Sequence, residues 1–507
     1  MSPTTPTPPR WFAAADLGAT SGRVILGHLG DGRFDFEEVE RFDNEPIAAG
    51  DGLHWDSDDL FAHVRRGIEL ADIASGRQLA AVGVDTWGVD YGRLDAAGRL
   101  LEQPFHYRDP RTAGIPADVF AVVAAEELYA RCGLQQLDFN TIFQYVAQAG
   151  DPAWDEVATT LLMPDLLSYW LSGRRVGEVT IASTTGLLDV TTRRWCPSTC
   201  QALADHWGLP LPRVLPELVE PGTILGPTRP GLMARPIDVV AVGGHDTASA
   251  VVAVPALNRN FAFISSGTWS LVGLELDAPV LTPASQAADF TNELGVDHTV
   301  RYLKNVMGLW VLSQCQRQWA AQGLDVDLAD LLRQAAALPA LGCVIDIDDN
   351  RLMPIGDMPA RVLALARETG QALAPDPVSL TRCIVDSLAV AYRLSLRRAC
   401  QLADRTVEVV HIVGGGARNH LLCQLTAEAT GLPVVAGPAE GTALGNLLVQ
   451  ARAVGALSGG LDELRRVAVA SSQPVTYRPG VIAIAPAAWA GAERIIATAQ
   501  AARGDRS

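Results

Sequence analysis

Two segments about 250 residues apart in the chain share one local pattern. Residues 13–27 (AAADLGATSGRVILG) and 263–274 (FISSGTWSLVGL) each indicate an apolar strand, a tight turn containing Gly, Ser or Thr, and a second apolar strand. In a chain of 507 residues, long enough for two domains, such a pair predicts a duplicated half-fold whose turns face each other across a cleft. Backbone N–H groups and hydroxyls in such turns form a donor surface for phosphate oxygens. The pair therefore predicts an ATP-using enzyme that holds the phosphates between two lobes.

Composition narrows the class of protein. The apolar content of 48% is enough for large cores, and no uncharged apolar run reaches the length that would span a membrane. The net charge of −17 comes without a basic stripe, which argues against nucleic acid as a main partner. We expect a soluble cytoplasmic enzyme without a membrane partner, preceded by a disordered Pro/Thr tail over residues 1–10.

The rarest residue types exclude two common kinds of site. The eight cysteines are scattered and form no C-x-x-C pair, so neither a zinc site nor a dense disulfide framework is expected. Lys304 is the only lysine, and the chain has no Gly-Lys pair. The common nucleotide P-loop requires such a pair to reach the β- and γ-phosphates. The two hairpins are therefore the candidates for the nucleotide site.

Two further stretches carry residues suited to chemistry at strand ends. In AAVGVDTWGVDYGRL (80–94), a buried strand leads to carboxylates, Trp87 and Gly88, as expected of a sugar site; a strand-end turn with a core Trp is an equal alternative. In VVAVGGHDTASAVVA (239–253), Asp246 stands at a strand end and a helix start, where a general base belongs. An N-cap role is at least as good an explanation of Asp246.

Apolar spacing predicts several other elements. Period 3.6 predicts helices, whereas β-branched runs bounded by Gly indicate strands. The Pro/Gly-rich span 210–236 is the best domain boundary. Expected elsewhere are helices over 58–74, 161–173, 301–314, 380–400 and 438–455, a strand-like run over 179–190, and strand, triple Gly, helix and strand over 407–437. In the last, Gly414–Gly416 allow close approach of a flat ligand, and the helix start attracts phosphate.

These blocks together resemble the FGGY carbohydrate kinases, a branch of the actin-like ATPase superfamily, and within them the rhamnulokinases. The resemblance runs from about residue 13 to residue 454, with twelve landmarks in a fixed order. Among these landmarks are ADLGATSGR (15–23), GVDTWGVDY (83–91), LMPD (162–165), GHDTASAV (244–251), SSGTWSLVG (265–273), FTNE (290–293), LKNVMGLW (303–310) and IVGGGARN (412–419).

The resemblance implies an α/β fold with two ribonuclease-H-like, actin-like ATPase domains flanking a central cleft. The expected division is an N-terminal FGGY domain over residues 11–240 and a C-terminal one over 241–507. The implied cofactors are ATP and Mg²⁺. The implied site comprises Asp246 as base; Gly88, His245, Asp246, Thr247 and Asn305 on the ketose; Ala19, Thr20, Ser21, Gly22, Arg23, Thr268 and Gly415 on ATP; and Asp16, which would hold Mg²⁺ through water.

Three departures from the rhamnulokinase pattern stand out. Thr20 replaces a usual Ser and keeps the hydroxyl. Ser313, with Gln314 beside it, stands where the family places an ATP-contacting Gln. Gly243-Gly244 replaces a bulkier pair before His245, which predicts a differently shaped sugar pocket.

The sequence thus predicts an ATP-dependent kinase for the 1-hydroxyl of a ketose, with L-rhamnulose first and L-fuculose, xylulose or another polyol as alternatives. Two other classes stay open. An actin-like ATPase such as a chaperone or filament protein would share both hairpins, but it needs no DTWG-type segment and no HDT base. A sugar sensor without catalysis would not need Asp16, Asp246 and Thr268.

Overall fold

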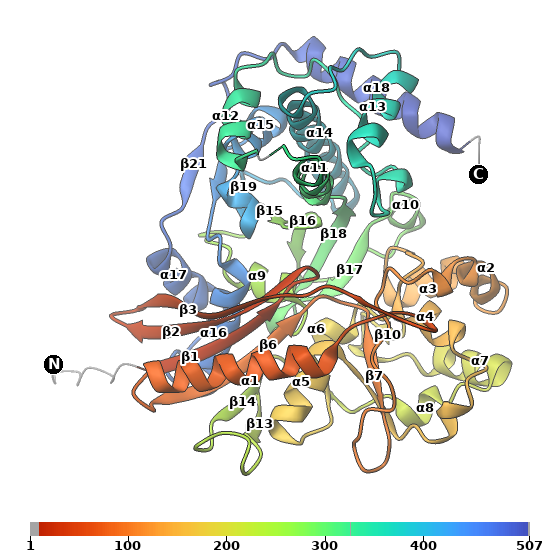
Figure 1. Cartoon of the computed structure of the whole chain (residues 1–507), viewed down its shortest axis with the longest axis vertical. Helices are drawn as coiled ribbons and strands as arrows, with labels where there is room; N and C mark the ends of the chain where they lie inside the picture. Colours follow the sequence, from red (N-terminus) through yellow and green to blue (C-terminus); the bar gives the residue numbers. More distant parts are fainter. Residues whose placement is uncertain (1–9, 325, 505–507) are drawn as a thin grey trace. The chain divides into compact units, whose positions relative to one another are not determined.

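The computed structural model describes residues 10–324 and 326–504, which form two compact units (Figure 1). Unit 1 comprises residues 10–257, Glu275–Tyr302 and Gly441–Gln473, and unit 2 comprises Asn258–Leu274, Leu303–Glu440 and residues 474–504. The units therefore interleave along the chain, whereas the sequence predicts one boundary near residue 240. Most of the predicted tail lies outside the described residues; Arg10, its last residue, begins a strand instead.

Unit 1 contains a twisted sheet of six strands in the order β13-β14-β6-β1-β2-β3. β1 pairs antiparallel with β2 and parallel with β6, which places the first predicted hairpin at the sheet centre. The strands are β1 (Arg10–Leu17), β2 (Ser21–Gly30), β3 (Arg33–Asp43), β6 (Leu79–Thr86), β13 (Thr223–Pro227) and β14 (Asp238–Ala241).

Both faces of the central strand β1 are buried. Ala13, Ala15 and Leu17 pack with the helix on one face, whereas Phe12 and Ala14 pack with a different helix on the other. α1 (Ser57–Ala74) lies along the first face, as Figure 1 shows, together with α5 (Met163–Ser172). α16 (Gly441–Ala453) covers the second face and packs on α9 (Asp246–Val252). A central strand covered on both sides accounts for the uninterrupted apolar run AAA in the sequence.

A helical region with its own apolar cluster extends unit 1. Its helices are α2 (Ile115–Phe120), α3 (Ala125–Cys132), α4 (Thr141–Ala147), α6 (Val179–Ala182), α7 (Pro197–Trp207) and α8 (Leu211–Val214). Short strands accompany them, namely β7 (Tyr91–Leu94), β8 (Thr159–Leu162), β9 (Gly177–Glu178), β10 (Leu188–Asp189), β11 (Arg194–Trp195) and β12 (Leu218–Val219). The remaining elements of unit 1 are β4 (Ile47–Ala49), β5 (Gly52–His54), α10 (Pro283–Gln286), β17 (Thr291–Leu294) and α17 (Leu461–Ser471).

Unit 2 has a sheet whose strands follow the order β18-β16-β15-β19-β20-β21. These are β15 (Phe261–Ser266), β16 (Ser270–Leu276), β18 (Val300–Val306), β19 (Val409–Val413), β20 (Val434–Ala436) and β21 (Val475–Tyr477). Its helices are α11 (Trp310–Ala321), α12 (Leu328–Ala336), α13 (Met358–Glu368), α14 (Pro377–Ala403), α15 (His420–Thr430) and α18 (Pro486–Gly504).

The two sheets repeat one topology. In each, the hairpin's first strand pairs parallel with a later strand, which pairs parallel with the next, and an antiparallel strand closes the edge. β1, β6, β14 and β13 correspond in this way to β15, β19, β20 and β21. The predicted duplication of a half-fold is therefore confirmed, and the α/β class with it.

The helices with strong periodicity also match their predictions, including α1, α14 and α16. Two predictions were wrong. Residues 301–306 form strand β18, and helix α11 begins only at Trp310. Gly308, between the two, packs so closely that a Cβ would lie 2.6 Å from the Ser270 hydroxyl. Within 179–190, residues Val179–Ala182 form helix α6 because the Glu178 side chain caps its first turn.

Candidate active site

Asp16 lies one residue before the end of β1, and the sheet register places it beside Arg23 on β2 and Asp85 on β6. The Arg23 guanidinium donates to Asp16 Oδ2 from Nη2 at 2.8 Å and from Nε at 3.1 Å. The Asp16 side chain is nearly buried and that of Arg23 is partly exposed. A carboxylate and a guanidinium therefore stand together at the end of the central strands, where ligands bind in sheets of this kind.

Asn44 stabilises the turn between β1 and β2 through two hydrogen bonds. Its Nδ2 donates to the Gly18 carbonyl at 2.8 Å, and its backbone N–H donates to the Thr20 carbonyl at 3.2 Å. The side chains of Ala19, Thr20 and Ser21 are half-buried. Gly22 is required by packing, because a Cβ there would lie 2.2 Å from the Phe42 ring. The backbone of this turn is thus fixed, as a phosphate-binding turn requires.

Asp85 is fully buried next to this turn. Asn446 of α16 donates to its Oδ2 at 2.5 Å, while Oδ1 has no hydrogen-bond partner. Burial, and then the nearby Asp16 carboxylate, raise the pKa of Asp85 well above its ordinary value. Asp85 therefore holds a proton more readily than an exposed aspartate.

Asp246 is the first residue of α9, and the residue that caps the helix is His245, whose side chain makes no capping bond. The N-cap alternative for Asp246 is therefore wrong. Its side chain is 31% exposed and accepts a bond from the Thr247 hydroxyl at 3.1 Å. Desolvation raises the pKa of Asp246, His245 opposes the shift, and Asp16 adds to it. A carboxylate of increased basicity and open to solvent suits a general base.

His245 connects Asp246 to a buried ion pair. Its Nε2 lies 3.4 Å from Asp246 Oδ1, and its Nδ1 lies 3.0 Å from Glu293 Oε2. The fully buried Arg301 places Nη1 3.0 Å from the same Glu293 oxygen. Burial alone would raise the pKa of Glu293, but Arg301 and then His245 lower it. Glu293 is thus an anion that orients the imidazole.

Sequence reasoning included Glu293 in the FTNE landmark but gave it no role, and it missed Arg301. An arginine amid the apolar residues of a buried strand is the signal that could have identified the pair.

In the segment around Gly88, Trp87 belongs to the hydrophobic core, whereas Gly88 is partly accessible. Trp55 and Trp87 both donate their indole N–H to Asp90 Oδ2, at 2.7 and 3.0 Å, and their rings contact each other at a tilt of 37° with centroids 4.1 Å apart. Burial raises the pKa of Asp90 to about 6. The core alternative therefore holds for Trp87. Gly88 is half-buried, and a Cβ there would lie 3.2 Å from the Thr184 side chain.

In unit 2, Thr268 lies in the turn between β15 and β16. The start of α11 supports this turn, because Leu309 and Trp310 donate backbone bonds to the Gly267 and Thr268 carbonyls, each at 3.1 Å. After the turn, the Ser270 hydroxyl hydrogen-bonds with the buried Tyr392 hydroxyl at 2.6 Å. The second hairpin turn is thus as firmly held as the first.

The three glycines after β19 differ in what they face. A Cβ on Gly414, whose φ is +82°, would lie 2.9 Å from the Ser266 carbonyl, and one on Gly416 would lie 2.0 Å from the Ser266 hydroxyl. Both glycines allow the loop to pack on the end of β15. A Cβ on Gly415 would meet nothing within 4 Å. Gly415 is thus the member of the three that faces open space.

The other unit 2 positions lie on β18 and α11. Asn305 is half-buried on β18. Ser313 is exposed on α11, whereas Gln314 is buried and its Nε2 has no hydrogen-bond partner. Of the two residues that stand near the family's Gln, Ser313 alone presents its side chain to solvent.

The predicted site residues fall into two sets. Unit 1 contains Asp16, Ala19–Arg23, Gly88 and His245–Thr247, and unit 2 contains Thr268, Asn305 and Gly415. Among the described residues, no cluster of three or more His, Cys, Asp or Glu side chains could hold a metal ion. The same part of the chain contains no helix long and apolar enough to cross a membrane.

Comparisons with known proteins cover nearly the whole chain. The N-terminal domain of the FGGY family of carbohydrate kinases matches residues 12–253, and its C-terminal domain matches residues 262–454. A rhamnulokinase from Bacteroides thetaiotaomicron is 41% identical over 489 residues, which covers 94% of this chain and 98% of that protein. A rhamnulokinase from Oceanobacillus iheyensis is 36% identical, covering 92% of this chain and 97% of that protein.

Solved structures agree on the fold. A ligand-bound xylulose kinase from Lactobacillus acidophilus matches with a TM-score of 0.76 at 16% identity, covering 98% of both chains. A Plasmodium falciparum glycerol kinase with ADP matches with a TM-score of 0.73 at 13% identity, covering 93% of this chain and 94% of that chain.

Proposed function

Because the chain belongs to the FGGY family of carbohydrate kinases, we propose that it transfers the γ-phosphoryl group of ATP to the 1-hydroxyl of L-rhamnulose. The products are L-rhamnulose 1-phosphate and ADP. The relatives named rhamnulokinase, 36–41% identical over most of the chain, support this substrate. The use of ATP and a sugar as substrates suits a cytoplasmic location.

The observation that carries the proposed chemistry is the position of Asp246. It lies at the start of α9, partly exposed, with a raised pKa and an oriented histidine beside it. Asp246 accepts the proton of the sugar's 1-hydroxyl as that oxygen attacks the γ-phosphorus in line. His245, Thr247, Gly88 and Asn305 bind the ketose. No covalent intermediate is required.

The two hairpin turns bind the phosphates. Ala19–Arg23 and Thr268 supply backbone N–H groups and hydroxyls, and Arg23 adds a positive charge that lies against Asp16 in the free protein. Gly415 lies against adenosine, which needs the open space found at that residue. Exclusion of water around the phosphates limits wasteful hydrolysis.

The residues present fit a magnesium ion held loosely. Mg²⁺ keeps several waters and binds through one or two carboxylates together with substrate phosphates. Asp16 offers such a carboxylate at a strand end, and no larger acidic cluster is needed. When bound, the ion neutralises charge that develops on the transferred phosphoryl group. In the free protein Arg23 balances Asp16.

The Gly243-Gly244 pair does not by itself favour another sugar. A Cβ on Gly243 would lie 2.9 Å from the Ser249 amide, and one on Gly244 would lie 2.9 Å from Glu178 Oε2. Local packing against the protein itself therefore explains both glycines, and L-rhamnulose remains the proposed substrate.

A coupled ADP-release assay against L-rhamnulose, L-fuculose, D-xylulose, L-ribulose and glycerol tests the proposal. We expect the highest kcat/KM with L-rhamnulose and little ATP turnover without sugar. A clear preference for another acceptor would contradict the substrate and leave the kinase activity intact. Sugar-independent ATP turnover would instead favour an actin-like ATPase. The absence of any ATP turnover, with or without sugar, would favour a sensor.

A further inference from the structure

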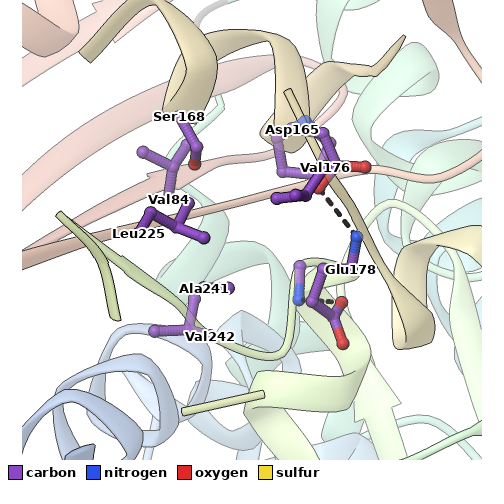
Figure 2. A pocket seen from close by; sticks show the side chains of 10 residues that line it. Val84, Asp165, Ser168, Val176, Glu178, Leu225, Ala241 and Val242 are labelled. Carbon is purple, nitrogen blue, oxygen red and sulfur yellow. Dashed lines mark hydrogen bonds between the residues drawn. The ribbon is translucent and has the colours of Figure 1, made fainter. Parts of the chain in front are cut away.

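The carboxylate of Glu178 binds the backbone that leads to Asp246. Glu178 ends β9 and is buried beside a small cavity in unit 1 (Figure 2). Its Oε2 accepts a bond from the Gly244 N–H at 2.9 Å. The same oxygen accepts bonds from the Thr180 hydroxyl at 2.5 Å and the Ile181 N–H at 3.2 Å, and Oε1 accepts a bond from the Thr180 N–H at 2.8 Å. Four donors thus converge on one carboxylate. One of them, the Gly244 N–H, lies two residues before Asp246, the proposed base.

The Gly244 peptide group is held on both sides. Its N–H donates to Glu178, and its carbonyl accepts a bond from the Thr86 N–H at 2.9 Å. The next N–H, that of His245, points to the Thr180 hydroxyl at 3.4 Å. The chain therefore passes from β14 into α9 through backbone groups fixed by β6 and by the start of α6.

Asp165 on α5 also lines this cavity and hydrogen-bonds to the Glu178 backbone. Its Oδ1 accepts a bond from the Glu178 N–H at 3.0 Å, drawn as a dashed line in Figure 2, and its buried Oδ2 has no partner. Burial, and then the Glu178 charge, raise the pKa of Asp165 well above its ordinary value. The pKa of Asp165 is thus raised, and Glu178, with its four donors, is the member of the pair suited to the negative charge.

We propose that Glu178 is a positioning residue for phosphoryl transfer, which fixes the Gly244–His245 backbone and thereby places the Asp246 carboxylate against the sugar hydroxyl. The inference rests on the proposed function only where it is tested through kcat. A displacement of a catalytic base by about 1 Å costs on the order of 10²-fold in rate. The hydrogen bond from Gly244 to Glu178 therefore affects the rate even though Glu178 touches no reacting atom.

The protonation of Glu178 gives the contact a pH dependence. Burial raises the pKa of Glu178 to about 7, against the lowering effect of its hydrogen bonds. The other charged or titratable groups near it are Asp165 on α5, His245 and Asp246 at α9, and Arg301 on β18. As the pH falls through about 7, a proton on the carboxyl removes an acceptor from its donors. The hydrogen bond from the Gly244 N–H to Glu178 then weakens.

Glu178→Gln is the direct test, because the amide keeps the shape but its single oxygen cannot accept both from the Thr180 N–H at Oε1 and from the donors at Oε2, so an NH2 group must face a donor. We expect kcat to fall by about 10 to 10²-fold, with the KM for ATP little changed. Asp165→Asn is the matched control, because the amide keeps the shape and its oxygen still accepts the Glu178 N–H. It should keep nearly the wild-type kcat.

The pH profile separates positioning from a general loss of stability. Between pH 8 and pH 6 the wild-type kcat should fall more steeply than that of Glu178→Gln, so that the ratio of the two kcat values narrows toward low pH. A constant ratio would overturn the proposal.

Hydrogen exchange of the substrate-free protein tests the contact independently of any reaction. The Gly244 amide should lose protection in Glu178→Gln and keep it in Asp165→Asn. If no acceptor is phosphorylated, the proposed function fails while this measurement still decides the contact. Unchanged protection, or wild-type kcat in Glu178→Gln, would overturn the inference.

Should Glu178→Gln fail to fold, Thr180→Val provides a milder version, since it removes only the hydroxyl between Glu178 and the His245 N–H. The same lowered kcat with unchanged ATP KM is expected; unchanged kcat in folded Thr180→Val would count against the proposal.

Discussion

The buried pair of Glu293 and Arg301 offers the sharpest test of how the site is held. The Arg301 guanidinium is fully buried and its Nη1 lies 3.0 Å from Glu293 Oε2, while the Glu293 side chain is 6% exposed. Glu293→Gln removes the negative charge and leaves the guanidinium without its counterion. Breaking a buried pair from one side costs about 3–5 kcal/mol. At roughly 2–4 °C per kcal/mol for a large domain, the unfolding midpoint should fall by roughly 6–20 °C.

A double variant separates charge from shape. In Glu293→Gln with Arg301→Met, no charge is left unpaired, so differential scanning fluorimetry should show a recovery of much of the lost midpoint. The kcat/KM for the ketose should stay low in both variants, because His245 Nδ1 has lost the carboxylate 3.0 Å away. A single variant that unfolds within 2 °C of wild type, or a double variant that unfolds below the single one, would refute the reasoning. If the double variant recovered both its unfolding midpoint and its kcat/KM, Glu293 would not be needed to orient His245.

Three further predictions concern the other site residues. Asp246→Asn should lower kcat by roughly 10² to 10⁴-fold while isothermal titration shows retained ATP binding; near-normal turnover would exclude Asp246 as the base. Asp85, whose folded-state pKa is raised by burial and Asp16, binds its proton more tightly folded than unfolded. Its stabilising contribution is therefore complete below the unfolded pKa of about 3.9 and is lost as the pH rises through the higher folded value. The melting temperature of Asp85→Asn should accordingly fall less than wild type as the pH rises from 4 to 8, and parallel curves would contradict this. Gly416→Ala should destabilise unit 2 by about 1–3 kcal/mol, because its Cβ would overlap the Ser266 hydroxyl, whereas Gly415→Ala should melt like wild type and raise the KM for ATP; equal melting of the two variants would contradict the assignment.

The sequence predicted the fold wherever local pattern and tertiary structure agree. Both hairpins, the helices α1 and α14, and the strand, Gly, helix and strand over 407–437 have periods and end signals that no neighbour overrides. The prediction failed at 301–306. There β18 is buried on consecutive residues, with Arg301 among them, so the period of two is hidden and the apolar spacing of the following helix dominates the pattern.

The sequence predicted the site residues that lie in motifs, but not the partners that surround them. Asp16 and Asp246 stand at turn and strand-end positions that the sequence marks. The partners that set their chemistry come from remote segments, and no local spacing links them. Glu178 reaches Gly244 across 66 positions, and Arg301 reaches His245 across 56. The glycines before His245, which suggested a different sugar pocket, are explained once Glu178 is seen against Gly244.

The proposal that Asp246 is the base rests on how the carboxylates of unit 1 are paired, as well as on the motif. Each of four neighbours has a strong partner: Arg23 for Asp16, Asn446 for Asp85, Arg301 for Glu293, and amide and hydroxyl donors for Glu178. Within the part of the chain that the structure describes, Asp246 has the Thr247 hydroxyl at 3.1 Å and the His245 ring at 3.4 Å. Deep burial keeps substrate away from these four carboxylates, including Asp85 and Glu178, whose pKa values burial also raises. Asp246 has weak donors, a raised pKa and 31% exposure, so a proton from a sugar hydroxyl can reach it and be held there. The other four carboxylates serve to bind, orient or hold the protein around it.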